Sequence, residues 1–276
     1  METLSKHKCF GGTLGYYRHD AASTQCPMRF TVFTPPKPNG AALIYLSGLT
    51  CTEDNFTVKA GAYRIAAELG LTIIAPDTSP RGEGVATSDE GDLGFGAGFY
   101  IDATQVPWST HYKMETYIAK ELHALVVDKF DLNMRRIGIF GHSMGGHGAL
   151  TLFLKYPKKY RSLSAFAPIC SPTHSPWGQK VFENYLGGDK EAWKAHDATE
   201  LLIAKGAVDT PILIDQGSAD AFIERLHPSL FEAACAAAGQ ALMLRYQEGY
   251  DHGYFFIQTF MEEHLFYHAA QLIEPS

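Results

Sequence analysis

The amino-acid sequence predicts an α/β fold with a mostly parallel central sheet, antiparallel strands at its N-terminal edge and helices on both faces. From residue 41 onward, short β-branched apolar runs alternate with helix-length amphipathic stretches. This alternation is typical of a parallel sheet covered on both faces. With 276 residues and 46% hydrophobic content, the chain is long enough to bury a large core. No repeat or linker divides it, so we interpret residues 1–276 as a single domain.

The expected elements follow from this alternation. The predicted strands are residues 41–46, 71–75, 137–140, 162–167, 212–214 and 242–246, and the predicted helices are residues 58–69, 112–129, 144–155, 226–238 and 254–270. Residues before about 35 are expected to form the antiparallel edge strands. The segments 80–99 and 171–198 are expected to be long loops at the C-terminal edge of the sheet, where long loops are usually functional or disordered.

The motif Gly-His-Ser-Met-Gly at residues 141–145 lies between a predicted strand and a predicted helix. Strand, G-x-S-x-G and helix together form the nucleophile elbow of an α/β-hydrolase. A Cβ at either glycine would crowd the neighbouring strand and helix, and the serine itself must adopt a strained conformation. The sequence therefore predicts an α/β-hydrolase fold with Ser143 as the nucleophile.

The partners of the nucleophile follow it in this fold in the chain order Ser, Asp or Glu, His. Asp220 lies in a small-residue loop after the strand 212–214, and His252 lies in the loop before the last helix. We therefore expect Asp220 to orient His252, which takes the proton from Ser143. Two alternatives stay open: Asp220 could be a turn or N-cap residue, and Asp215, within or at the end of the strand, is a second candidate acid.

A tetrahedral intermediate also needs two backbone donors for its oxyanion. The expected donors are the N–H groups of Met144, directly after the nucleophile, and of Leu49, in the turn after the first parallel strand. An ordinary β-turn is the alternative interpretation of that turn. His142 is expected to pack beside the nucleophile. Trp177, in a predicted loop, is either a pocket wall or plain loop packing.

Charge and composition limit the partners. The formal net charge of −7, without a cluster of Lys or Arg, argues against nucleic acid or an anionic membrane. An anionic small substrate needs only one or two local cations, for which Lys59 and Arg81 are candidates. No run approaches the roughly 18 apolar residues of a membrane span. The glycines at 94–98 do not match a dinucleotide-binding pattern, and no His or Cys spacing fits a metal site. We therefore expect neither cofactor nor metal.

The cysteines and the first residues bear on the compartment. The five cysteines are an odd number at irregular spacings, and residues 1–8 lack the apolar stretch of a signal peptide. Both observations favour reduced thiols and a cytoplasmic location.

Several segments, in order along the chain, resemble the S-formylglutathione hydrolase (esterase D) family. They are residues 46–56 (LSGLTCTEDNF), 75–82 (APDTSPRG), 96–104 (GAGFYIDAT), 140–149 (FGHSMGGHGA) and 249–252 (GYDH). The resemblance implies hydrolysis of the thioester S-formylglutathione to glutathione and formate in formaldehyde detoxification. It also implies a cytosolic homodimer that needs no cofactor and has side activity on short acyl esters.

Residue by residue, the resemblance assigns the nucleophile to Ser143, the acid to Asp220 and the base to His252. It places the family's cysteine beside the oxyanion loop at Cys51, which is either a pocket-wall residue or a buried inert thiol. The chain departs from the family pattern at Ser175, where a cysteine often precedes Pro-Trp-Gly, and at Gly253, where a serine often follows the histidine. These departures leave the leaving-group preference and the rigidity of the loop open.

Three other functions remain possible from the sequence. The nearest is a general short-chain carboxylesterase without glutathione specificity. The others are an acyltransferase that uses the same acyl-enzyme, and a non-catalytic binding protein with a hydrolase fold, which a complete triad in the proper order disfavours.

Overall fold

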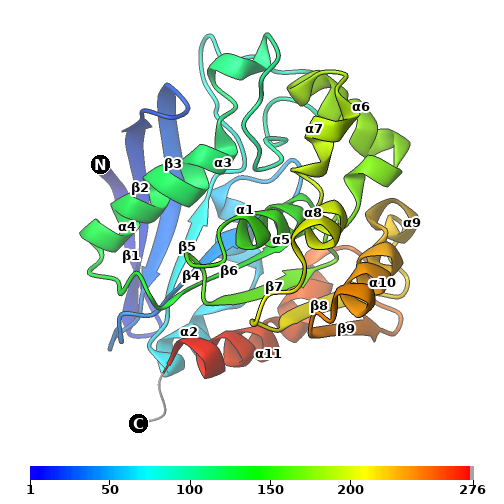
Figure 1. Cartoon of the computed structure of the whole chain (residues 1–276). Helices are drawn as coiled ribbons and strands as arrows, with labels where there is room; N and C mark the ends of the chain where they lie inside the picture. The colour runs from blue at the N-terminus through cyan, green and yellow to red at the C-terminus, as the bar shows by residue number, and fades with distance from the viewer. Residues whose placement is uncertain (274–276) are drawn as a thin grey trace.

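The computed structural model describes residues 1–273. Within this range one nine-stranded sheet has the order β1-β2-β3-β5-β4-β6-β7-β8-β9 (Figure 1). The strands are β1 (Glu2–Cys9), β2 (Gly12–Ala21), β3 (Cys26–Thr34), β4 (Ala42–Leu46), β5 (Thr72–Pro76), β6 (Ile137–His142), β7 (Ser162–Phe166), β8 (Ile212–Gly217) and β9 (Leu242–Gln247). β1, β2 and β3 pair antiparallel, β3 pairs antiparallel with β5, and the remaining strands are parallel. This confirms the predicted fold class.

Helices cover both faces of the parallel strands. In Figure 1, α2 and α11 lie on one side of these strands, and α5 and α8 lie on the other. The helices are α1 (Glu53–Lys59), α2 (Tyr63–Leu69), α3 (Met114–Thr116), α4 (His123–Lys129), α5 (Met144–Lys155), α6 (Pro176–Leu186), α7 (Lys190–Lys194), α8 (Ala198–Lys205), α9 (Ile223–Leu226), α10 (Pro228–Ala238) and α11 (Tyr254–Leu272). A π-helical segment, η2 (Tyr117–Leu122), joins α3 to α4, and the short 3-10 helices are η1 (Trp108–Thr110) and η3 (Pro172–His174). No helix of the described residues is both long and apolar enough to cross a bilayer.

Three predicted elements are wrong in detail. The single helix expected at 58–69 is two helices, because Gly61 between them has a φ of +69° that L side chains rarely adopt. The helix expected at 226–238 is likewise divided at His227, in the left-handed conformation, before Pro228 begins α10. The loop expected at 171–198 is mostly helical. In it Ser175 caps α6 and Pro176 occupies the first turn, where proline is favoured.

The buried strands explain the continuous apolar runs of the sequence. Every residue of β4, β6 and β7 is buried, as expected for strands covered on both faces. The carboxyl ends of parallel strands meet at one edge of the sheet, where α/β proteins bind ligands. The loops after β4, β6 and β8 therefore all reach the same edge.

Polar contacts as well as apolar packing fix α11 to the sheet. His268 contacts Ser162 Oγ at 2.6 Å and Ser164 Oγ at 2.8 Å, both on β7. His264 contacts Ser164 Oγ at 2.8 Å and Asp215 Oδ2, on β8, at 3.1 Å. All five side chains are buried, so these hydrogen bonds satisfy groups that water cannot reach.

Candidate active site

Ser143 occupies a strained turn between β6 and α5. Its φ of 56° and ψ of −117° are unusual for a residue with a side chain. A Cβ at Gly145 would collide with the carbonyl oxygen of Leu46, and a Cβ at Gly141 would collide with the backbone of Gly145. The turn therefore requires glycine on both sides of the serine, for the steric reason that the motif indicated.

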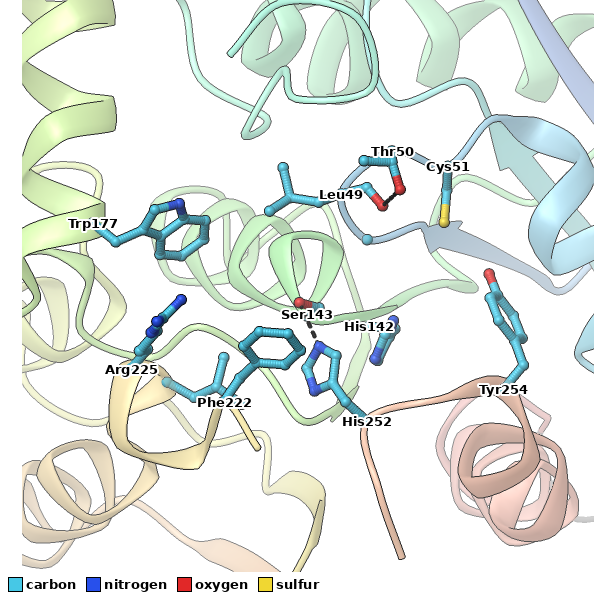
Figure 2. Close-up of a pocket in the computed structure, with 12 residues that line it drawn as sticks. Leu49, Thr50, Cys51, His142, Ser143, Trp177, Phe222, Arg225, His252 and Tyr254 are labelled. Carbon is cyan, nitrogen blue, oxygen red and sulfur yellow. Dashed lines mark hydrogen bonds between the residues drawn. The ribbon is translucent and has the colours of Figure 1, made fainter. Parts of the chain in front are cut away.

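The imidazole of His252 bridges a hydroxyl and a carboxylate. His252 Nε2 lies 2.9 Å from Ser143 Oγ (Figure 2). His252 Nδ1 lies 2.6 Å from Asp220 Oδ2. Both distances are within hydrogen-bond range. The structure thus brings together three side chains from the loops after β6, after β8 and before α11, as the fold's chain order indicated.

Asp220 is held by further donors. Its Oδ1 accepts a hydrogen bond from the Phe222 N–H at 2.8 Å, and its Oδ2 accepts one from Gln216 Nε2 at 2.9 Å. Burial raises the pKa of Asp220, but the hydrogen bonds from His252, Phe222 and Gln216 outweigh burial and leave this pKa below its ordinary value. The carboxyl group is therefore ionised at neutral pH and accepts all three bonds as an anion.

Asp215, the second candidate acid, lies elsewhere. It is fully buried inside β8 and contacts Arg245 at 2.6 Å, His264 at 3.1 Å and Gln247 at 3.1 Å. Burial raises its pKa, but the bonds from His264 and Arg245 outweigh burial and bring it to about 2. Because its carboxylate is engaged by these three side chains and does not contact His252, Asp215 does not orient His252 in this structure.

The two expected oxyanion donors, the N–H groups of Leu49 and Met144, have no backbone acceptor outside helices and strands in the described chain. Met144 is the first residue of α5, so its N–H has no acceptor inside the helix and lies at the positive end of the helix dipole. No hydrogen bond from the Leu49 N–H is found among residues 1–273, and Leu49 lines the pocket. The Thr50 N–H bonds to the Gly96 carbonyl at 2.9 Å, which places the glycine-rich loop directly behind the Leu49 turn.

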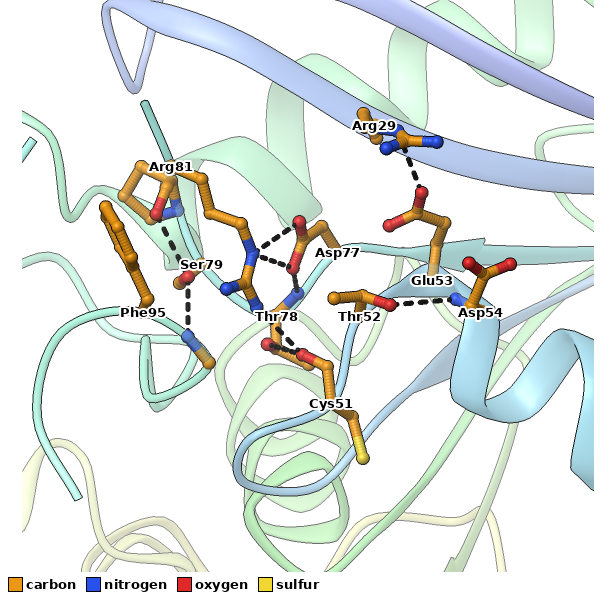
Figure 3. Close-up of polar contacts among 12 residues, drawn as sticks. Arg29, Cys51, Thr52, Glu53, Asp54, Asp77, Thr78, Ser79, Arg81 and Phe95 are labelled. Atoms are coloured by element: carbon orange, nitrogen blue, oxygen red, sulfur yellow. Dashed lines mark hydrogen bonds and ion pairs between the residues drawn. The ribbon is translucent and has the colours of Figure 1, made fainter. Parts of the chain in front are cut away.

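Arg81 supports this turn from behind (Figure 3). Its guanidinium pairs with Asp77 at 2.8 and 3.1 Å and donates to the Cys51 carbonyl at 3.1 Å. The Thr78 hydroxyl donates to the same carbonyl at 2.5 Å. Arg81 does not line the pocket, and neither does Lys59, which is exposed and lies 5.7 Å from the Tyr254 ring. Neither cation proposed from the sequence therefore faces the pocket.

A pocket of about 350 Å³ surrounds the Ser143 hydroxyl. Its lining consists of Gly48, Leu49, Thr50, Cys51, His142, Ser143, Trp177, Phe222, Arg225, Leu226, His252 and Tyr254. Cys51, His142 and Trp177 were expected near the site, although Trp177 belongs to the first turn of α6 instead of a loop. Phe222, Arg225, Leu226 and Tyr254 were not predicted. The signal for them was proximity in sequence, since they follow Asp220 or His252 within six residues.

His142 and Cys51 are both uncharged at neutral pH. Burial, with the nearby His252, lowers the pKa of His142 well below its ordinary value. Its ring lies 4.5 Å from that of His252, and neither ring nitrogen has a partner among the described residues. Cys51 is 8% exposed, and burial raises the pKa of its thiol. A protonated thiol is a poor nucleophile, so Cys51 is suited to forming a wall of the pocket.

The described residues contain no group of three or more His, Cys, Asp or Glu side chains that could hold a metal ion. The polar side chains that line the pocket include the Ser143 hydroxyl, the His252 imidazole and the Arg225 guanidinium.

Comparison with known proteins identifies the family. Residues 21–267 match the model of the esterase family described as "Putative esterase". Over 274 residues the chain is 51% identical to the S-formylglutathione hydrolase of Paracoccus denitrificans (strain Pd 1222), with 98% of each chain covered. The chain belongs to the S-formylglutathione hydrolase family of esterases. This confirms the resemblance seen in the sequence.

The fold of the S-formylglutathione hydrolase family is preserved along the chain. The solved structure of an S-formylglutathione hydrolase from Agrobacterium tumefaciens has a TM-score of 0.95 and 46% identity, covering 99% of this chain and 100% of that one. A ferulic acid esterase with a TM-score of 0.73 and 15% identity, covering 95% of this chain and 98% of that one, shares the fold alone.

This member of the S-formylglutathione hydrolase family departs from the expected pattern at Ser175 and Gly253. The Ser175 hydroxyl accepts a hydrogen bond from the Gly178 N–H at 3.0 Å and so caps α6, two residues before Trp177. The Gly253 N–H donates to Asp251 Oδ1 at 2.8 Å in the loop that carries His252. Both residues thus have a local structural role beside the pocket.

Proposed function

We propose that this esterase hydrolyses the thioester S-formylglutathione to glutathione and formate. The observation that carries the proposal is the hydrogen-bonded chain of Ser143, His252 and Asp220 inside the pocket, in a chain half identical to a hydrolase of that name. Short acyl esters are expected as secondary substrates, because the same attack works on an oxygen ester.

In the first step, His252 Nε2 takes the proton of the Ser143 hydroxyl while Ser143 Oγ attacks the formyl carbon. Asp220 stabilises the imidazolium that forms and holds the ring in the required tautomer. The Leu49 and Met144 N–H groups bind the oxyanion of the tetrahedral intermediate. The intermediate collapses as the carbon–sulfur bond breaks, leaving a formyl ester on Ser143 and releasing the thiolate, which takes the proton from the His252 imidazolium and leaves His252 neutral for the second step.

In the second step, water attacks the formyl ester. His252 takes a proton from this water, and the new tetrahedral intermediate collapses as the bond to Ser143 Oγ breaks. The serine regains its proton from His252, and formate leaves. Every proton therefore passes through one imidazole, and no oxidant, reductant or cofactor is needed.

The decisive measurement compares kcat/KM for S-formylglutathione and p-nitrophenyl acetate. We expect the thioester to be preferred. If the ester is preferred by orders of magnitude, the chain is a general short-chain carboxylesterase and the thioesterase proposal is wrong. Added alcohol acceptors test for acyl transfer, which would give an acylated alcohol as product.

Ser143→Ala tests the nucleophile separately from the substrate. We expect the loss of labelling by a fluorophosphonate and a fall in kcat of roughly 10⁴-fold or more. Full turnover by this variant would rule out catalysis by Ser143.

The compartment and the assembly belong to the same proposal. The five cysteines are unpaired in the structure, which suits a reducing compartment, and we propose the cytoplasm. We also propose a homodimer: the edge strand β9 exposes Met243 (55%) and Tyr246 (49%). Sedimentation of the purified protein tests the homodimer.

A further inference from the structure

The pocket has two unlike sides. In Figure 2, Cys51 and Tyr254 lie on one side of Ser143, and Trp177 and Arg225 lie on the other. Cys51 is only 8% exposed, whereas Phe222, next to Arg225, is 44% exposed and Arg225 itself is exposed. The side that carries Arg225 therefore opens to solvent, and the side that carries Cys51 is closed.

The guanidinium of Arg225 has no acidic partner among residues 1–273. Arg81 and Arg245, by contrast, are paired with Asp77 and Asp215. Among the arginines without an acidic partner in the described residues, Arg225 lines the pocket. The neighbour found for Arg225 is the ring of Phe222, whose centroid lies 6.0 Å from the guanidinium carbon. That ring in turn lies 5.0 Å from the imidazole of His252. The unpaired guanidinium therefore lies beside Phe222, and Phe222 lies beside His252, which is hydrogen-bonded to the Ser143 hydroxyl.

The size of the two parts of the substrate indicates which side of the pocket each part occupies. A formyl group is a single carbon and its oxygen, so it fits beside Ser143 without a large acyl cavity. The rest of the substrate must then extend toward the open side, where Phe222 and Arg225 lie. Glutathione carries two carboxylates and one ammonium group at neutral pH, so its net charge has the same sign as the protein's −7. A local cation offsets this repulsion at the place where the substrate enters.

We propose that Arg225 binds a carboxylate of the thiol leaving group and gives the enzyme its preference for anionic thioesters. This inference rests on the proposed function. A planar guanidinium presents a fork of donors that matches both oxygens of a carboxylate. Neither Lys59 nor Arg81 offers the same contact, since neither lines the pocket and Arg81 is committed to Asp77. Arg225 is a specificity residue: it contacts the part of the substrate that leaves.

The test uses Arg225→Gln and three substrates that share one serine. The first is S-formylglutathione, the second is its diester, in which both carboxylates are masked, and the third is p-nitrophenyl acetate. We expect Arg225→Gln to raise KM for S-formylglutathione roughly fivefold with kcat changed by less than about twofold, as for loss of one exposed charged contact. KM for the diester and for p-nitrophenyl acetate is expected to stay at the wild-type value.

Arg161→Gln is the matched control. It removes the same charge at an exposed position directly before β7, at the opposite edge of the sheet, and should leave all three KM values unchanged. Arg225→Lys should recover part of the loss, because it restores the charge without the fork.

Three results would overturn the assignment: an unchanged KM for S-formylglutathione in Arg225→Gln, an equal loss on all three substrates, or the same loss in Arg161→Gln. The proposed function itself is tested with the wild-type enzyme alone. It would be wrong if the wild type hydrolysed S-formylglutathione poorly and p-nitrophenyl acetate well. The two failures are therefore distinguished within one set of measurements.

Discussion

Replacement of Gln216 by leucine tests whether the acid must be oriented by more than the histidine. Gln216 is fully buried, and its Nε2 donates to Asp220 Oδ2, the oxygen that also accepts from His252 Nδ1. A hydrogen bond to a charged group contributes about 1.5–3 kcal/mol, which corresponds to roughly one to two pKa units. Without it the pKa of Asp220 rises, but from a lowered value, so Asp220 still ionises at neutral pH.

The substitution is therefore expected to disturb the orientation of the Asp220 carboxylate and not its charge. We expect Gln216→Leu to lower kcat roughly tenfold, equivalent to about 1.4 kcal/mol of transition-state stabilisation, with KM unchanged. The free energy of unfolding should change less than loss of a buried bond implies, since the Gln216 amide oxygen has no partner in the described chain. Steady-state kinetics and urea denaturation measure both quantities.

Gln247→Leu is the control for this experiment. Its amide donates to Asp215 Oδ1 at 3.1 Å, so the same substitution removes the same kind of bond from the aspartate that does not contact His252. We expect wild-type kcat. Wild-type kcat in Gln216→Leu, or an equal loss in Gln247→Leu, would refute the reasoning.

Three further outcomes are expected. Gly145→Ala should abolish folding of the elbow, because its Cβ meets the Leu46 carbonyl, whereas Gly188→Ala, with open space around its Cβ, should keep the wild-type melting temperature; comparable melting temperatures would contradict this. Cys51→Ala should keep most of the activity, and alkylation of Cys51 in the wild type should be slow at neutral pH and accelerate with rising pH, because burial raises its thiol pKa; fast alkylation at pH 7 would oppose this. The free energy of unfolding should fall as pH drops from about 6.5 to 5, because burial lowers the pKa of His264 and of His268, and the unfolded chain then binds protons that the folded chain does not. Each such histidine contributes up to about 1.4 kcal/mol per pH unit, and a flat urea midpoint across this range would count against it.

The sequence predicted the features that depend on backbone sterics and chain order. The elbow was recognisable because only glycine fits at positions 141 and 145. Asp220 and His252 were recognisable because the fold brings the ends of parallel strands to one edge. Their chemical roles are predictions that the kinetic experiments test.

The remainder of the pocket depends on how loops turn after these positions. Phe222 and Arg225 face the pocket because α9 is a single short helix that folds back beside Asp220, and no periodic pattern of apolar residues encodes this. The helices in 171–198 were missed, although Ser175 and Pro176 form a recognisable helix start. Lys59 and Arg81 were chosen for charge alone. A sequence does not show that Asp77 already binds Arg81.

The ladder of histidines and serines between α11 and the sheet has a consequence for catalysis. His252 sits just before the first turn of α11, so any sliding of this helix would carry the base away from the hydroxyl. Apolar attraction is non-directional, so it defines the register of the helix less strictly than hydrogen bonds do. A shift of α11 by one residue would separate His264 and His268 from their partners and leave buried donors and acceptors without hydrogen bonds. The hydrogen bonds of His264 and His268 therefore fix the position of α11 along the sheet, and with it the position of His252, which directly precedes this helix.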